Sequence, residues 1–84
     1  MLLIDVRTKE EFDEGHLKTA LHIPHTEIQD VIEDYITDHN AEIVVYCRSG
    51  HRSGFAKEIL EELGYQNVVN AGGYEALIDG EYDS

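Results

Sequence analysis

The sequence has few residues that would crosslink or stiffen a small fold. Its 84 residues include one cysteine, one proline and no tryptophan. One cysteine cannot form a disulfide within the chain, so the fold must be stabilised by a hydrophobic core. Hydrophobic residues make up 42% of the chain, a share typical of globular rather than disordered sequences. We therefore expect a single domain over residues 1–84.

Basic residues are also scarce. Six lysines and arginines stand against 18 aspartates and glutamates, which gives a formal net charge of 6 − 18 = −12. Such a charge opposes contacts with nucleic-acid phosphates and with an anionic membrane surface. We predict that neither nucleic acid nor a membrane is a partner.

Long hydrophobic runs are missing. The longest, residues 43–47, has five residues, whereas a membrane-spanning helix needs about twenty. The start of the chain, Met1 to Ile4 followed by Asp5, has neither the basic leader nor the apolar length of a secretory signal. The sequence thus predicts a cytoplasmic location.

Strand-like and helix-like segments alternate along the chain. Four short apolar runs predict strands: residues 2–4, 20–23, 43–46 and 68–69. Capping-box patterns or helical spacing of apolar residues predict helices that begin near Thr8, Thr26, Ser53 and Tyr74. A glycine turn is expected at Gly72 and Gly73, before the last helix.

The run at 43–46 is apolar at consecutive positions, as in a strand of a parallel sheet covered on both faces. Together with the alternation of strands and helices, it predicts an α/β fold: a small, open, mostly parallel β-sheet flanked by helices on both faces. Ligands of such sheets bind beyond the carboxyl ends of the strands. Cys47 follows this strand directly, which makes it a candidate site residue.

The segment after Cys47 collects positive charge. No acidic residue occurs in positions 43–57, whereas Arg48, Arg52 and Lys57 supply half of the six permanent cations. We expect Gly50 and Gly54 to let the backbone curl, so that its N–H groups point inward near a helix N-terminus. A loop of this kind binds a small anion.

The same features favour the thiolate form of Cys47. Cations and a helix N-terminus lower the pKa of a thiol, and a fall from about 8.5 to about 6.5 raises the thiolate share at pH 7 from roughly 3% to three-quarters. A lone cysteine is otherwise most often a small buried hydrophobe. We interpret Cys47 as a nucleophile, because a core cysteine gains nothing from two nearby arginines and two glycines.

The spacing of the closing arginine separates two classes of cysteine nucleophile. Arg52 lies five positions after Cys47, which gives Cys-x4-Arg. Cysteine-dependent phosphatases and arsenate reductases carry Cys-x5-Arg, a loop wide enough for a tetrahedral phosphate. The shorter loop argues against those activities and suits a cysteine that carries an additional sulfur atom.

Several motifs in order make the sequence resemble the single-domain rhodaneses, a family of sulfurtransferases, and in particular the small phage-shock type. The resemblance rests on these segments: Asp5-Val6-Arg7, Glu14-Gly15-His16-Leu17, His22-Ile23-Pro24, the loop from Cys47 to Ser53, Gly64-Tyr65 and Gly72-Gly73. Unlike many members, the chain starts almost at the Asp5-Val6-Arg7 strand and has Leu77 where a tryptophan is often found. A sheet edge left bare in this way favours dimerisation, so we expect a monomer or a weak dimer.

The resemblance implies an activity and a site. The Cys47 thiolate would take the outer sulfur of thiosulfate or a similar anionic donor and pass it, from a persulfide, to cyanide or another thiophilic acceptor, including an acceptor protein. The predicted substrate-binding residues all lie in the loop: Arg48, Ser49, Gly50, His51, Arg52 and Ser53. The arginines would bind the donor, the backbone N–H groups would cradle the persulfide, and no metal or organic cofactor is implied.

Two other functions remain open. A non-catalytic or sulfur-carrier interaction module would keep the fold, although such modules usually lose the cysteine or the loop charges. A phosphatase or arsenate reductase is disfavoured by the spacing. The role of His51 is undecided between tuning the charge of the loop and simple exposure.

Overall fold

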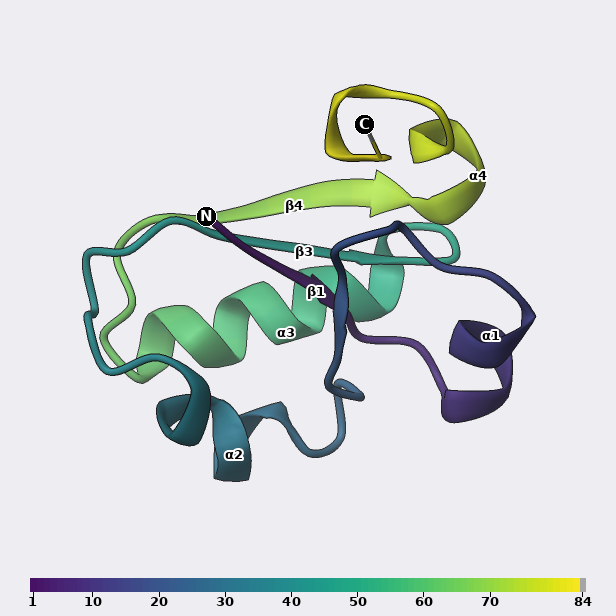
Figure 1. Cartoon of the computed structure of the whole chain (residues 1–84). Helices are drawn as coiled ribbons and strands as arrows, with labels where there is room; N and C mark the ends of the chain where they lie inside the picture. The colour runs from purple at the N-terminus through teal and green to yellow at the C-terminus, as the bar shows by residue number, and fades with distance from the viewer. Residues whose placement is uncertain (84) are drawn as a thin grey trace.

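In the computed structural model, residues 1–83 are described and strands alternate with helices along the chain (Figure 1). The elements are β1 (Leu2–Asp5), α1 (Lys9–Glu14), β2 (Leu21–His22), α2 (Ile28–Tyr35), β3 (Ile43–Cys47), α3 (His51–Glu62), β4 (Val68–Gly73), α4 (Tyr74–Leu77) and a 3-10 turn at Glu81–Asp83. No helix in this part of the chain is long and apolar enough to cross a membrane.

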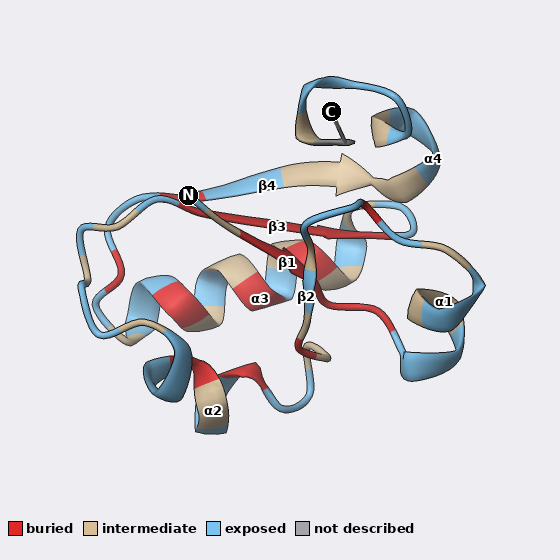
Figure 2. Ribbon diagram, viewed as in Figure 1, coloured by how far each residue is buried: buried red, intermediate tan, exposed pale blue. Residues whose placement is uncertain are grey.

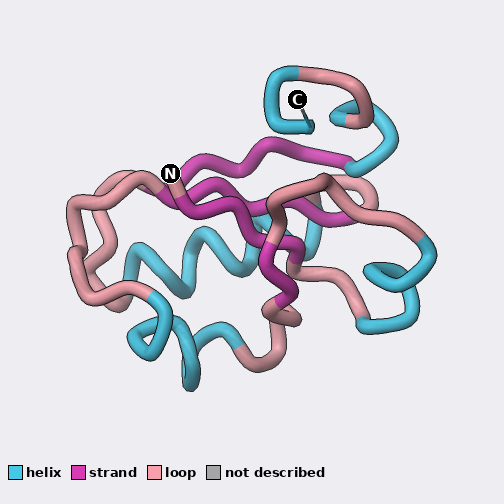
Figure 3. Tube along the Cα trace, in the orientation of Figure 1, coloured by secondary structure: helices cyan, strands magenta, loops and turns pink. Residues whose placement is uncertain are grey.

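The four strands form one sheet in the order β2-β1-β3-β4, and every neighbouring pair is parallel. Figure 3 shows the strand segments in magenta. All five residues of β3 are buried. The expected α/β fold and its central strand are therefore confirmed, and the carboxyl ends of β1 and β3 lie side by side.

The continuous apolar character of β3 follows from helices and loops packing on both faces of the sheet (Figure 2). Because successive side chains of a strand point to opposite faces, Val45 and Cys47 join the core cluster that includes residues of α2 and α3, while Val44 and Tyr46 join a second cluster. The second cluster is covered by α4 and the C-terminal segment through Tyr74, Leu77 and Tyr82.

The first predicted capping box is confirmed and the second is wrong. The hydroxyl of Thr8 accepts the N–H of Glu11, and the Glu11 carboxylate accepts the N–H of Thr8, a complete capping box. A helix does begin near Thr26, as predicted, but the N-cap of α2 is Glu27 and no side chain caps the helix. With the N-cap one residue later, Thr26 and Gln29 do not occupy the N-cap and N3 positions that a capping box needs.

The expected glycine turn at Gly72 and Gly73 is also wrong, because both residues belong to β4. The register between β3 and β4 shifts at Val45 and Tyr46, where β4 contains one extra residue, and Gly72 supplies a φ of +101° just after it. Gly73 pairs with Cys47. Beta-bulges of this kind re-aim the chain next to functional sites.

Candidate active site

Cys47 ends β3, and its sulfur atom faces the loop that follows it. The Sγ atom accepts hydrogen bonds from the N–H of Gly50 at 2.9 Å and from the hydroxyl of Ser53 at 3.4 Å. The residue has 0% relative exposure. The residues around Cys47 therefore cover its sulfur atom.

The pKa of the Cys47 thiol is lowered, as expected, chiefly by hydrogen bonds, and the positive charge of Arg52 also attracts the thiolate. Burial alone raises this pKa, and the Ser53 hydroxyl and the backbone N–H groups of Ser53, Ser49 and Gly50 outweigh it. The thiolate is thus stabilised by N–H and O–H dipoles that the loop directs at the sulfur.

The conformation of this loop depends on Gly50. It is the N-cap of α3 and adopts the left-handed conformation with φ +91°. A Cβ atom at Gly50 would lie 3.3 Å from the Cα of Gly72. Gly54 was expected to let the loop backbone curl before the helix. This prediction is wrong, because α3 begins at His51 and Gly54 lies inside the helix.

Gly73 brings β4 close to the loop from the other side. A Cβ atom at Gly73 would lie 2.5 Å from the carbonyl oxygen of Arg48. Real Cβ atoms do not approach a backbone oxygen this closely, so only glycine fits here without displacing the loop. The pairing of Gly73 with Cys47 explains this proximity.

The two loop arginines have different surroundings. The Arg52 guanidinium donates to both carboxylate oxygens of Glu11, at 2.7 and 2.9 Å. The exposed Arg48 forms no ion pair within residues 1–83. Although no acidic residue is near Arg52 in the sequence, α1 supplies one in space, and the sequence carried no local signal for it.

This ion pair makes stability depend on pH. The hydrogen bond from Arg52 lowers the pKa of Glu11 from 4.5 to about 2. Because the folded-state pKa is depressed, the stabilisation is present above pH 4.5 and disappears as the pH falls through about 2. At neutral pH we expect it to contribute about 1–2 kcal/mol, less than the full shift implies because the pair is partly solvated.

We predict that Glu11→Gln flattens the acid dependence of stability. Urea unfolding at several pH values should show a smaller loss of unfolding free energy between pH 4.5 and 2 for this variant than for the wild type. The control is Glu10→Gln, at an exposed neighbour in α1. Equal acid dependence in Glu11→Gln and wild type would contradict the prediction.

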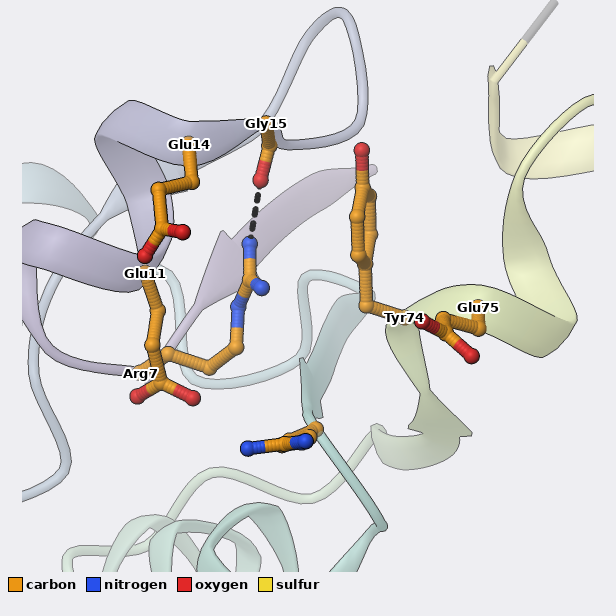
Figure 4. A pocket seen from close by; sticks show the side chains of 7 residues that line it. Arg7, Glu11, Glu14, Gly15, Tyr74 and Glu75 are labelled. Carbon is orange, nitrogen blue, oxygen red and sulfur yellow. Dashed lines mark hydrogen bonds between the residues drawn. The ribbon is translucent and has the colours of Figure 1, made fainter.

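A cavity of about 240 Å³ has Arg48 among its lining residues. Figure 4 labels the other residues of the lining. Its lining residues come from α1, α4 and the ends of β1 and β3: Arg7, Glu11, Glu14, Gly15, Arg48, Tyr74 and Glu75. Arg7 donates to the Gly15 carbonyl at 2.6 Å, and its guanidinium lies 4.4 Å from the centre of the Tyr74 ring. Of the two arginines in the lining, Arg48 is the one without an ion pair among the described residues.

Arg7 also connects the cavity lining to a buried polar network. The Asp5 carboxylate has no exposed surface and accepts hydrogen bonds from the backbone and side chain of Arg7 and from the hydroxyl of Tyr46. The Tyr46 oxygen in turn accepts the N–H of Leu17 at 3.1 Å. Asp5 and Arg7 thus tie the end of β1 to its surroundings.

The remaining loop residues lie at the surface. Ser49 and His51 are exposed, and the His51 ring packs edge-on against Phe55 with 5.2 Å between centroids. One residue that the sequence reading missed, Asn70 of β4, contacts the loop: it bonds to Ser53 and to Gly50. A polar residue near the carboxyl end of a predicted strand was the available signal for it.

The fold and the loop define a class: a parallel α/β domain in which a tight loop, leading into a helix, directs backbone donors at a cysteine that ends the central strand. The sequence matches the rhodanese-like domain family over residues 1–79. The chain belongs to the rhodanese family and is an enzyme of the sulfurtransferase class.

Similar proteins agree in fold and in sequence. Thiosulfate sulfurtransferase PspE of Escherichia coli (strain K12) is 46% identical over 74 residues, which cover 88% of this chain and 71% of that protein. A solved structure described as a rhodanese with anions from E. coli has a TM-score of 0.85 and 43% identity, covering 88% of this chain and 87% of that one. The putative sulfur carrier protein YrkF of Bacillus subtilis (strain 168) is 32% identical over 68 residues, 81% of this chain and 36% of that protein.

Proposed function

We propose that this chain transfers sulfane sulfur from thiosulfate, or a similar anionic donor, to cyanide or another thiophilic acceptor through a persulfide on Cys47. The observation that carries the proposal is the set of loop donors directed at Sγ, which stabilise a thiolate and equally a terminal persulfide anion. The names of the similar E. coli proteins, a thiosulfate sulfurtransferase and a rhodanese with anions, support an anionic donor.

Two displacements complete the cycle. In the first, the Cys47 thiolate attacks the outer sulfur of thiosulfate, the S–S bond of the donor breaks, and sulfite leaves with the bonding electron pair. In the second, cyanide attacks the terminal sulfur of the persulfide, thiocyanate forms, and the electron pair of the broken bond restores the thiolate. Electrons balance within each step, so we propose that no metal or organic cofactor takes part.

Mass spectrometry of the intact protein tests this proposal. After incubation with thiosulfate and removal of the donor, the wild type should gain the mass of one sulfur atom and lose it again when cyanide is added. The adduct should map to Cys47. A wild-type protein that stays unmodified at saturating thiosulfate contradicts the proposal.

For donor binding we propose Arg48, because it is exposed, lines the cavity and has no ion-pair partner within the described chain. Arg48→Gln should raise the KM for thiosulfate about tenfold with little change in kcat, since a hydrogen bond to a charged group contributes about 1.5–3 kcal/mol. Steady-state kinetics at constant ionic strength measure this.

The matched control is Lys57→Gln in α3, which changes the net charge by the same amount. Because Lys57 lies six positions along the helix from His51, it is about 9 Å farther down the axis. If both variants raise KM equally, the effect comes from overall charge and the role of Arg48 is contradicted.

For the other loop residues the proposed parts differ. The backbone N–H groups from Ser49 to Ser53 hold the sulfur, and Arg52 supplies positive charge while its bond to Glu11 fixes the loop against α1. That His51 is a substrate-binding residue stays a prediction, and we assign it no particular role. An acceptor protein, beside a small-molecule acceptor, stays a prediction. The monomeric or weakly dimeric state, the cytoplasmic location and the single domain over 1–84 likewise stay predictions.

A second candidate function is a sulfur carrier that hands its persulfide only to a partner protein, favoured by the similarity to the putative sulfur carrier protein YrkF. It predicts the same mass gain with thiosulfate but slow release to cyanide. A phosphatase or arsenate reductase remains disfavoured by the Cys-x4-Arg spacing.

A further inference from the structure

Asn70 makes more side-chain hydrogen bonds to the loop region than its exposed position on β4 suggests. Its Oδ1 atom accepts from the Ser53 hydroxyl at 2.7 Å and from the N–H of Gly72 at 3.0 Å. Its Nδ2 atom donates to the carbonyl of Gly50 at 3.0 Å. Ser53 and Gly50 are two of the residues that donate to the Cys47 sulfur.

The partners of Asn70 fix which way its amide points. The N–H of Gly72 can only donate and the carbonyl of Gly50 can only accept, so the amide oxygen must face Gly72 and the amide nitrogen must face Gly50. The oxygen then also faces Ser53. The Asn70 side chain therefore holds Ser53 through an acceptor and Gly50 through a donor at the same time.

We propose that Asn70 is a positioning residue for sulfur transfer, which holds Gly50 by its carbonyl so that the N–H of the same residue stays in place to donate to the sulfur on Cys47. This inference rests on the proposed function. In this proposal a residue of β4, the strand that pairs with β3 beside Cys47, aligns the loop that connects β3 to α3.

The Ser53 hydroxyl has one hydrogen and two lone pairs, and the arrangement satisfies it in both protonation states of the cysteine. When Cys47 is a thiol, its S–H donates to Ser53, whose O–H donates to Asn70. When Cys47 is a thiolate or a persulfide anion, the Ser53 O–H turns to the sulfur and its hydrogen bond to Asn70 opens, while Asn70 Oδ1 keeps the N–H of Gly72. In this state Asn70 acts on the loop through Gly50, whose carbonyl still accepts from Nδ2.

The position of Asn70 in β4 explains why its side chain contacts the loop after Cys47. Asn70 pairs with Val45, two residues before Cys47, and the next residue of β4, Ala71, is the extra residue of the bulge. The bulge brings the N–H of Gly72 within hydrogen-bond distance of the Asn70 amide oxygen, which fixes the orientation of the Asn70 side chain.

The test is the pH dependence of alkylation of Cys47 by iodoacetamide, which requires no sulfur transfer. With Asn70→Ala, we expect the midpoint of the alkylation profile to rise by about one pH unit, because the N–H of Gly50 is no longer held against the thiolate. We also expect kcat for thiosulfate to fall about tenfold with KM within twofold, since Arg48 is unaffected. Asn67→Ala, an exposed asparagine just before β4, is the control and should match the wild type in both measurements.

Two more variants separate positioning from a purely structural role. Because Asn70 and the sulfur compete for the single Ser53 hydrogen, removing Asn70 also frees Ser53 to donate to the thiolate. Asn70→Ala should therefore shift the midpoint more in a Ser53→Ala background than in the wild type. Asn70→Asp keeps the acceptor for Ser53 but cannot donate to Gly50 and adds a negative charge, so its midpoint should also rise, and this variant serves if Asn70→Ala does not fold. An unchanged midpoint in the folded variants, or shifts that add fully in the double variant, overturns the proposal.

These outcomes are independent of the main proposal. If wild-type protein forms no persulfide but the alkylation midpoint still moves in Asn70→Ala, the proposed function fails while Asn70 is shown to control the thiolate. If the persulfide forms and the midpoint does not move, the proposed function stands and Asn70 has no positioning role.

Discussion

Replacing Cys47 by serine is expected to lower sulfurtransferase activity about a thousandfold or more and to remove the sulfur adduct with thiosulfate altogether. A serine hydroxyl stays protonated at neutral pH, and its oxygen cannot form the persulfide. Measurements of kcat/KM with thiosulfate and cyanide, together with intact mass, test this directly.

The serine variant should remain folded. The new hydroxyl can still accept the N–H of Gly50 at the end of β3, so the loss of unfolding free energy should be about 1 kcal/mol, within the range of ordinary single substitutions. Circular dichroism and urea unfolding check this. Residual turnover within tenfold of wild type in a folded variant would mean that another group carries the sulfur.

The largest expected effect on stability comes from Asp5→Ala, which should lower the unfolding free energy by about 3–5 kcal/mol. Asp5 and Arg7 form an ion pair with a distance of 2.7 Å and side-chain exposures of 0% and 6%. Removing the carboxylate leaves the guanidinium buried without its counter-charge and takes away the acceptor of the Tyr46 hydroxyl. For a domain whose total stability is about 5–15 kcal/mol, this approaches complete unfolding.

The matched control is Asp13→Ala, which removes a carboxylate from an ion pair of the same length. Lys9 and Asp13 also approach to 2.7 Å, but their side chains are 78% and 56% exposed. Exposed pairs contribute little, so this variant should lose less than about 1 kcal/mol in urea unfolding. Similar losses in Asp5→Ala and Asp13→Ala would contradict the idea that burial decides the cost.

The sequence predicted those parts of the fold that depend on neighbours within a few residues. The consecutive apolar residues of β3 indicated a strand covered on both faces, and this is confirmed by the two core clusters. The capping box at Thr8 and Glu11 also depends on residues close in sequence and is confirmed. The one expected at Thr26 did not form, because the N-cap of α2 is Glu27, one residue later.

The candidate site was predicted in part. The position of Cys47 at the carboxyl end of a central parallel strand followed from the alternation of elements, and the direction of its pKa shift followed from the composition of the loop. The causes of the shift were predicted in part. Backbone N–H groups at the start of α3 act on the sulfur as expected, but the Ser53 hydroxyl was not foreseen as a cause, and Arg52 is paired with Glu11 rather than free.

The sequence by itself therefore determined the strand that presents the cysteine and the loop that follows it, because spacing and composition act over short stretches of chain. Only the tertiary structure decided which groups surround that loop. Glu11 reaches Arg52 across 41 positions, and Asn70 reaches Ser53 across 17. Such contacts depend on the order and register of the strands, which places distant residues side by side without leaving a periodic pattern in the sequence.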